Sequence, residues 1–116
     1  MKQLKVLTIC QGGNCRSVCL GFVLKYKYNI DAVAASWEKN TKRTLDMLCE
    51  WADKIIFVEA QFIKYVPKKY SKKFIVIELG PDRWGNSLHP ELINICGQLL
   101  GGVIETKQLQ DRLAKS

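Results

Sequence analysis

The sequence is poor in the residues that build metal sites. It has one histidine, and its five cysteines form no Cys-x-x-Cys pair. Zinc sites need several such ligands at short, regular spacings. We therefore predict that the protein carries no metal and needs no cofactor.

Long apolar runs and a secretory leader are also missing. No stretch approaches the ~18 consecutive apolar residues of a membrane-spanning helix. Lys2 and Lys5 flank the start of the chain, and the first apolar run, Val6–Cys10, is too short for a signal peptide. We expect a cytoplasmic protein without a membrane partner, whose thiols are reduced because disulfides are rare in that compartment.

What the chain does have is the composition of an ordinary globular domain. Its 116 residues are 47% hydrophobic and 25% charged. A chain of this length can bury roughly two thirds of its unfolded surface, which is enough for one core. We predict a single domain over residues 1–116.

Basic residues outnumber acidic ones, 18 to 11, and give a net charge of +7. A positive surface attracts anions such as phosphates, nucleic acid or acidic membranes, although many basic proteins have no such partner. The densest basic run, Lys64–Lys73, matches no recognised RNA-binding pattern, and we interpret it as a solvated surface turn. Nucleic acid is therefore a disfavoured partner. The sequence does not indicate an oligomeric state.

Short β-branched runs alternate with helical periodicities along the chain. We predict strands at Lys5–Ile9, Ala32–Ser36, Lys54–Val58 and Phe74–Ile77. We predict helices at Cys15–Tyr28, from Asn40 or Thr41 to Ala52, at Gln61–Tyr65, from Pro90 to Gly101-Gly102, and at Ile104–Lys115. This alternation predicts an α/β fold, a four-stranded parallel sheet with helices on both faces. Such sheets bind ligands beyond the carboxyl ends of their strands.

Apolar residues recur at helical spacings in two of these segments. In the first helix the apolar residues Val18, Phe22 and Tyr26 recur at a spacing of four. The stripe of the helix after Pro90 is predicted to consist of Leu92, Ile95, Cys96 and Leu99.

The most specific segment is Cys10–Ser17, CQGGNCRS, which joins the first predicted strand to the first predicted helix. Free N–H groups at a helix start favour anions, and two glycines let a backbone curl its amides inward. Arg16 adds a planar fork that can hold two phosphate oxygens. We predict that a phosphate is held by the loop residues Gln11, Gly12, Gly13, Asn14, Cys15 and Arg16.

Cys10 stands where this loop leaves the strand. Positive charge from a helix N-terminus and an arginine favours the thiolate form of a cysteine, and a thiolate facing a phosphate is a nucleophile. Ser17 is placed to donate a hydrogen bond to that sulfur. The plainer alternative is a buried structural cysteine beside a glycine turn.

These residues resemble the signature of the low-molecular-weight protein tyrosine phosphatases, the short phosphatase-like branch included. The resemblance starts at Val6–Cys10 and Cys15-Arg16-Ser17, and continues through Glu50–Val58. Pro81–Trp84 and His89–Leu92 resemble the family's acid loop and the helix after it. The similarity touches most of the chain, and its first block is the specific part.

The resemblance implies a fold, a reaction and roles for residues. It implies a four-stranded parallel sheet and hydrolysis of phosphotyrosine-type monoesters through a phosphocysteine, with release of inorganic phosphate. The substrate would be a phosphorylated protein or a small aryl phosphate. The implied catalytic residues are Cys10 as nucleophile, Arg16 as phosphate clamp, Ser17 as the thiolate's partner and Asp82 as general acid. Cys15 would be a redox partner that forms a reversible disulfide with Cys10.

Further candidates come from aromatic and titratable residues. Trp84 and Trp37 are candidate walls of a substrate pocket, although tryptophan more often serves in packing. His89 precedes Pro90 and is most simply a cap residue, with a second acid-base role as the alternative.

Two other functions stay open. The chain departs from the family pattern at Gly13, Val18, Leu20-Gly21 and Arg83. An arsenate reductase on the same fold would relay oxidation through further cysteines, for which Cys49 and Cys96 are the candidates outside the first helix; both fit apolar stripes and are predicted to pack in the core. A non-catalytic module would bind a phosphorylated partner in the same loop.

Overall fold

The computed structural model describes residues 4–11, 16–79, 86 and 88–103. The elements that it describes, in chain order, are β1 (Lys5–Cys10), α1 (Arg16–Tyr28), β2 (Asp31–Ser36), α2 (Lys42–Trp51), β3 (Lys54–Phe57), the 3₁₀ helices η1 (Ala60–Tyr65) and η2 (Lys68–Lys73), β4 (Phe74–Val76) and α3 (Pro90–Val103).

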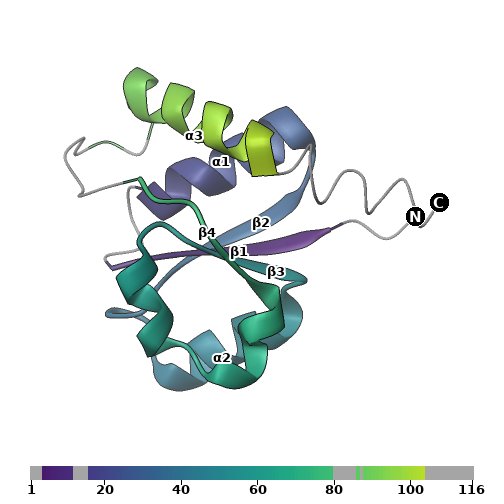
Figure 1. Ribbon diagram of the computed structural model, residues 1–116, viewed down its shortest axis with the longest axis vertical. Coiled ribbons are helices and arrows are strands. Elements are labelled where there is room, and N and C mark those ends of the chain that lie inside the picture. The colour runs from purple at the N-terminus through teal and green to yellow at the C-terminus, as the bar shows by residue number, and fades with distance from the viewer. Residues whose placement is uncertain (1–3, 12–15, 80–85, 87, 104–116) are drawn as a thin grey trace.

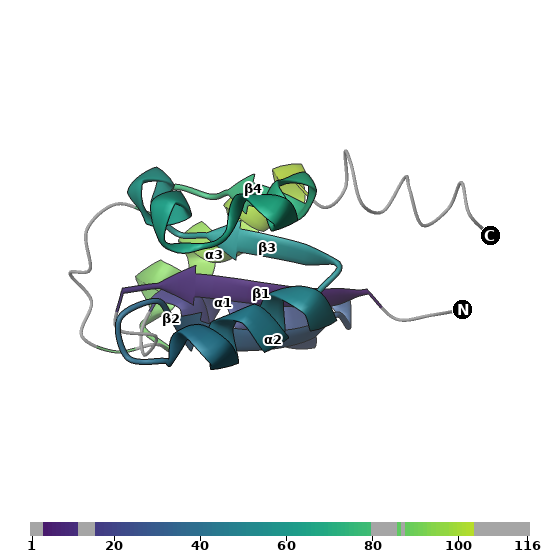
Figure 2. The same ribbon diagram turned by 90° about the horizontal axis from the view of Figure 1, so that it is seen from below.

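The four strands form one parallel sheet in the order β2-β1-β3-β4. Helices lie on both faces of it: α1 and α3 side by side on one face, and α2 with η1 and η2 on the other (Figure 1). Turning the molecule brings α2 in front of the strands and leaves α1 and α3 behind them (Figure 2). The α/β fold predicted from the sequence is confirmed.

The central strand β1 is buried on both faces, as expected for a parallel sheet covered by helices. Successive residues of a strand point to opposite faces. Thr8 and Cys10 point toward α1, because both make side-chain hydrogen bonds to Ser17 in its first turn. Leu7 and Ile9 alternate with them and are fully buried. The end of β1 therefore places Cys10 next to the start of α1.

Local chemistry sets the ends of α1 and α2. Asn29 takes a left-handed backbone with φ 53°, and the N–H of Ile30 donates to the carbonyl of Leu24 at 3.0 Å. This closes α1 in the way that a left-handed residue commonly ends a helix. Thr41 begins α2, because its hydroxyl accepts from the N–H of Thr44 at 3.1 Å.

Two expectations about α3 are corrected. Leu99, predicted for its apolar stripe, is exposed. The helix α3 does not end at its glycines but continues to Val103. A Cβ at Gly101 would lie 3.3 Å from the hydroxyl of Tyr28, so glycine permits close packing of α3 on α1.

The remaining differences are small. The lysine-rich run interpreted as a surface turn contains the 3₁₀ helix η2. The helix predicted at Ile104–Lys115 lies outside the described residues. Among those that are described, no helix combines the length and apolar character that crossing a membrane requires.

Candidate active site

Cys10 lies at the carboxyl end of β1, where its side chain is almost fully buried. Its sulfur lies 3.0 Å from the hydroxyl of Ser17, with which it shares a hydrogen bond. The hydroxyl of Thr8 donates to the carbonyl of Ser17 at 2.7 Å. Two side chains of β1 thus hold the first turn of α1, and the predicted pairing of Cys10 with Ser17 is present.

Arg16 opens α1, and its side chain is also buried. The Nη1 atom donates to the Oε2 atom of Glu59 at 2.6 Å, and the two side chains are 5% and 18% exposed. The guanidinium carbon lies 5.8 Å from the ring centre of Phe62. A carboxylate and an aromatic ring from the segment after β3 therefore fix the guanidinium at this edge of the sheet.

Gln11, the first residue of the predicted phosphate loop, is held by the segment after β2. Its backbone carbonyl accepts from the hydroxyl of Ser36, and its amide donates to the carboxylate of Glu38 at 2.6 Å. Ser36 is fixed in turn, because its hydroxyl accepts from the N–H of Lys39 at 2.8 Å and its own N–H donates to Asn40 at 2.7 Å. The exit of the chain from β1 is thus held in place by the end of β2.

Trp37 is joined to Cys10 through the backbone: the backbone N–H of Trp37 donates to the carbonyl of Cys10 at 3.3 Å. Its ring is stacked on that of Tyr65, with centres 3.6 Å apart and planes 5° from parallel. On the same side it approaches Phe62, at 5.9 Å between ring centres. The candidate pocket wall is therefore a pair of stacked rings, of which the sequence interpretation identified only one.

The geometry suits binding of an oxyanion next to a sulfur. A helix start and a guanidinium both attract negative charge, and both lie at the end of the strand that carries Cys10. Gly12, Gly13, Asn14 and Cys15 lie outside the described residues, as do Asp82 and Trp84. Their predicted roles therefore remain predictions.

His89 lies at the start of α3 and caps it. Its Nδ1 atom accepts from the N–H of Glu91 at 3.1 Å, and its carbonyl accepts from the N–H of Ile93 at 3.0 Å. The simpler of the two interpretations, a cap residue, is confirmed.

Cys49 and Cys96 are fully buried, as predicted for core positions. Burial raises the pKa of the Cys49 thiol from 9.0 to about 11. Cys96 of α3 meets Cys19 of α1, and the hydrogen bond between them lowers the pKa of Cys19. In the described part of the chain, no three His, Cys, Asp or Glu side chains are grouped so that they could hold a metal ion.

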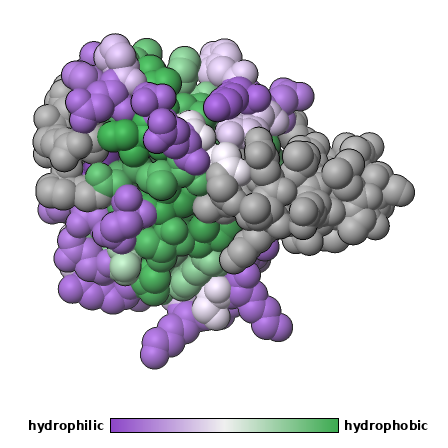
Figure 3. All heavy atoms as spheres, turned by 45° about the horizontal axis from the view of Figure 1, so that its top comes forward, coloured by the Kyte–Doolittle hydropathy of each residue, from purple (hydrophilic) through white to green (hydrophobic). Residues whose placement is uncertain are grey.

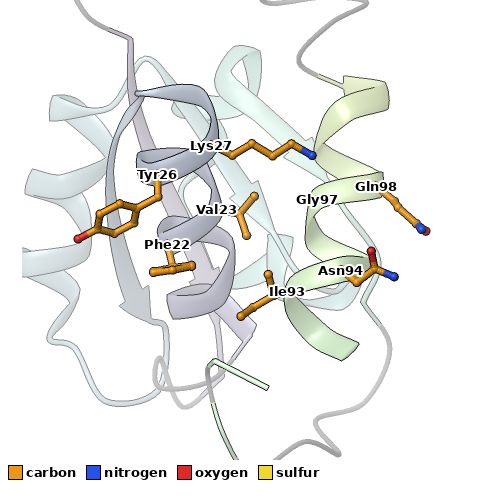
Figure 4. Close-up of a pocket in the computed structure, with 8 residues that line it drawn as sticks. All are labelled: Phe22, Val23, Tyr26, Lys27, Ile93, Asn94, Gly97 and Gln98. Carbon is orange, nitrogen blue, oxygen red and sulfur yellow. The ribbon is translucent and has the colours of Figure 1, made fainter. Parts of the chain in front are cut away.

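A cavity of about 490 Å³ opens on the other side of α1, between that helix and α3. Apolar residues gather on this part of the surface (Figure 3). Val23 and Ile93 lie between the two helices, and Lys27 reaches from α1 toward Gly97 (Figure 4). The α1 residues that line the cavity belong to later turns than Arg16 and Ser17, and the other lining residues come from α3.

Two of the residues that the sequence interpretation missed share one signal. Ser36 ends a predicted strand, and Glu59 directly follows another. Because parallel strands end at the same edge of the sheet, polar residues at these positions are candidates for any site there. The contact of Glu59 with Arg16 spans 43 positions, so no local pattern reveals it.

No protein-family model matches the chain, and no curated protein matches it. Solved structures show that the chain has the fold of low-molecular-weight tyrosine phosphatases. It is similar to the tyrosine phosphatase Wzb of Escherichia coli K30 in complex with phosphate, at a TM-score of 0.65 and 15% identity over 91% of this chain and 99% of that one.

Two further structures give the same result. Wzb of Vibrio vulnificus in complex with benzylphosphonate has a TM-score of 0.63 and 17% identity, over 90% of this chain and 96% of that one. The arginine phosphatase YwlE of Geobacillus stearothermophilus has a TM-score of 0.62 and 16% identity, over 92% and 96%. At such identities the likeness concerns the fold.

Proposed function

We propose that this protein is a cysteine-dependent phosphatase that hydrolyses phosphomonoesters of the phosphotyrosine type through a phosphocysteine on Cys10. The observation that carries the proposal is the pairing of Cys10 with Ser17 at 3.0 Å, at the end of β1 and beside the buried Arg16. Two of the structures that share the fold are described as a tyrosine phosphatase and an arginine phosphatase, which supports the reaction class.

The reaction has two steps in this proposal. The thiolate of Cys10 attacks phosphorus, the bond from phosphorus to the leaving oxygen breaks, and Asp82 donates its proton to that oxygen. Water then attacks the phosphocysteine and gives its proton to Asp82, the S–P bond breaks, and inorganic phosphate leaves. Arg16 binds phosphate oxygens in both steps, and the hydroxyl of Ser17 stabilises the departing thiolate.

The substrate is a phosphorylated protein or a small aryl phosphate. The stacked rings of Trp37 and Tyr65 support an aromatic leaving group, because Phe62 lies between them and Arg16: its ring centre is 5.9 Å from that of Trp37 and 5.8 Å from the guanidinium carbon. Cys15 completes the proposal as a redox partner: peroxide converts Cys10 to a sulfenic acid, which condenses with the Cys15 thiol and releases water. Peptide mapping after peroxide treatment, with and without dithiothreitol, tests this disulfide.

The decisive experiment measures phosphate release from p-nitrophenyl phosphate, phosphotyrosine and phosphoarginine by the parent and by Cys10→Ser. We expect turnover by the parent, fastest on the aryl esters, and none by C10S, because a serine hydroxyl stays protonated where a thiol ionises. Cys49→Ala, on the opposite face of the sheet, is the matched control and should keep its turnover.

Other outcomes assign the protein elsewhere. Undiminished activity of C10S would contradict the phosphocysteine mechanism. Phosphate binding without turnover by the parent would identify a binding module. Arsenate reduction with a thiol donor, in the absence of phosphate release, would identify an arsenate reductase.

A further inference from the structure

Glu59 contacts the guanidinium of Arg16 although neither sequence pattern nor proposed chemistry gives it a role. The distance of 2.6 Å, with Arg16 buried and Glu59 partly buried, marks a charge-assisted hydrogen bond that salt screens less than a fully exposed pair. Glu59 directly follows Val58, whose N–H donates to the carbonyl of Ile9 at 3.2 Å. The carboxylate therefore starts from backbone that is hydrogen-bonded to the strand carrying Cys10.

The carboxylate of Glu59 is itself held in place. Its second oxygen accepts from the amide of Gln61 at 2.7 Å. Glu59 occupies the N-cap position of η1 but makes no side-chain cap bond. The N–H of Ala60 donates instead to the carboxylate of Glu78 at 3.0 Å. The acid at the start of η1 is thus directed toward Arg16 and away from the helix that it begins.

The geometry of η1 explains how one short element contacts both Arg16 and Trp37. A 3₁₀ helix has three residues per turn, so Glu59, Phe62 and Tyr65 lie on one face. Glu59 binds Arg16, the ring of Phe62 lies 5.8 Å from the same guanidinium, and Tyr65 stacks on Trp37. The contacts follow the period of the helix.

We propose that Glu59 is a positioning residue that fixes the guanidinium plane of Arg16 for phosphoryl transfer, an inference that rests on the proposed function. A guanidinium is rigid and planar, so a carboxylate that holds one nitrogen fixes the direction of the other donors. Arginine binding to phosphate depends on this direction, because two N–H groups must meet two oxygens at once.

The test compares Glu59→Ala and Glu59→Gln with the parent on p-nitrophenyl phosphate, and measures kcat, KM, thermal unfolding and inhibition by vanadate. Misplacing a group at a reacting centre by about 1 Å can lower a rate 10²-fold. We expect kcat to fall on the order of 10–100-fold in E59A, with little change in KM, and vanadate inhibition to weaken in parallel. E59Q should fall less, because its amide oxygen still accepts from Arg16 through a weaker, uncharged bond.

Glu78→Gln is the matched control. It removes one carboxylate charge from the same edge of the sheet and keeps an acceptor for Ala60, and among the described residues it makes no hydrogen bond or ion pair with Cys10, Arg16 or Ser17. We expect E78Q to match the parent, which separates positioning of Arg16 from a general loss of negative charge. If E59A does not fold, the comparison of E59Q with E78Q decides.

Two results would overturn the inference in different ways. If E59A and E59Q keep the kcat of E78Q while C10S is inactive, Glu59 only balances the charge of buried Arg16 and the proposed function stands. If the folded parent releases no phosphate from any aryl ester, the proposed function fails and the inference fails with it.

Discussion

Ser17 ties the start of α1 to the sheet through both its backbone and its side chain. The carbonyl accepts from buried Thr8, and the hydroxyl meets the sulfur of Cys10. A hydrogen bond to a charged group contributes about 1.5–3 kcal/mol. Because the hydroxyl contacts the sulfur directly, its effect would be greatest where negative charge collects on that atom, in the free thiolate and in breakdown of the phosphocysteine.

In the proposed reaction, Asp82 protonates the leaving group. Asp82→Asn removes the proton donor, and general acid catalysis contributes about 10²–10⁴-fold. We expect D82N to lose most activity on unactivated esters such as phosphotyrosine and least on p-nitrophenyl phosphate, whose phenolate leaves without help. A series of aryl phosphates with graded leaving groups measures this.

The control for the acid is Asp53→Asn, an exposed carboxylate that accepts from the N–H of Lys5 at the opposite end of β1. The activity of D53N should vary across the series of aryl phosphates in the same way as that of the parent. An equal loss in D82N across the whole series would move the acid role to another residue.

The strands were predictable because each is a short apolar run, the pattern typical of parallel strands buried on both faces. Those runs end at the carboxyl edge, and two of them carry Cys10 and Ser36 there. Helix faces were harder to predict. Tyr26 and Leu99 fit helical spacings and yet are exposed. The buried apolar residues are Cys19, Leu20, Val23 and Leu24 in α1, and Leu92, Cys96 and Leu100 in α3.

The candidate site was predictable where it is contiguous in sequence and not where distant elements meet. The motif from Cys10 to Ser17 identifies the strand end and the helix start. It carries no information on Glu59 or Tyr65, which reach the site from η1. Such contacts depend on which strands are neighbours, and the order β2-β1-β3-β4 cannot be derived from local patterns.

The short helix η1 leads to a prediction about substrate choice. Tyr65→Ala removes the ring stacked on Trp37 and leaves the indole without that support. Aromatic pairs contribute about 0.5–1.5 kcal/mol. We expect KM for aryl phosphates to rise about 2- to 10-fold, while an alkyl phosphate of similar charge is unaffected.

Tyr26→Ala is the control for this element. Tyr26 is also an exposed tyrosine in a ring pair, with Phe22, but it lies on α1 and lines the cavity between α1 and α3. It should leave both KM values unchanged. If Y65A raises KM equally for aryl and alkyl phosphates, the stacked rings do not select the leaving group.

At the scale of the whole molecule, the parallel arrangement gathers the site at one edge. Cys10 ends β1, Ser36 ends β2 and Glu59 follows β3, and hydrogen bonds join all three to the segment that opens α1 or leaves β1. Helix α2, on the face of the sheet away from α1, contributes none of these contacts. Substitutions in α2 should therefore change the stability of the fold without changing the geometry of the candidate site.

Cys49 of α2 makes the stability of the fold depend on pH. Its thiol is fully buried, and burial is the main cause that raises its pKa from 9.0 to about 11. Below pH 9 the thiol is protonated in the folded and in the unfolded chain. Between pH 9 and 11 the unfolded chain loses this proton while the folded protein keeps it, so the folded state loses stability as pH rises through this window.

We therefore expect the melting temperature of the parent to fall more steeply from pH 9 to 11 than that of Cys49→Ala, measured by thermal unfolding in a pH series. Tyr70, whose pKa is raised by burial and by its hydrogen bond to Asp46, contributes to the slope in both proteins, so the difference between the slopes isolates Cys49. The alanine variant starts from a lower melting temperature because it leaves a small cavity, and the gap between the two proteins should narrow as pH rises. Parallel slopes would show that the thiol titrates alike in the folded and unfolded chains, which would contradict the burial of Cys49 in the folded protein.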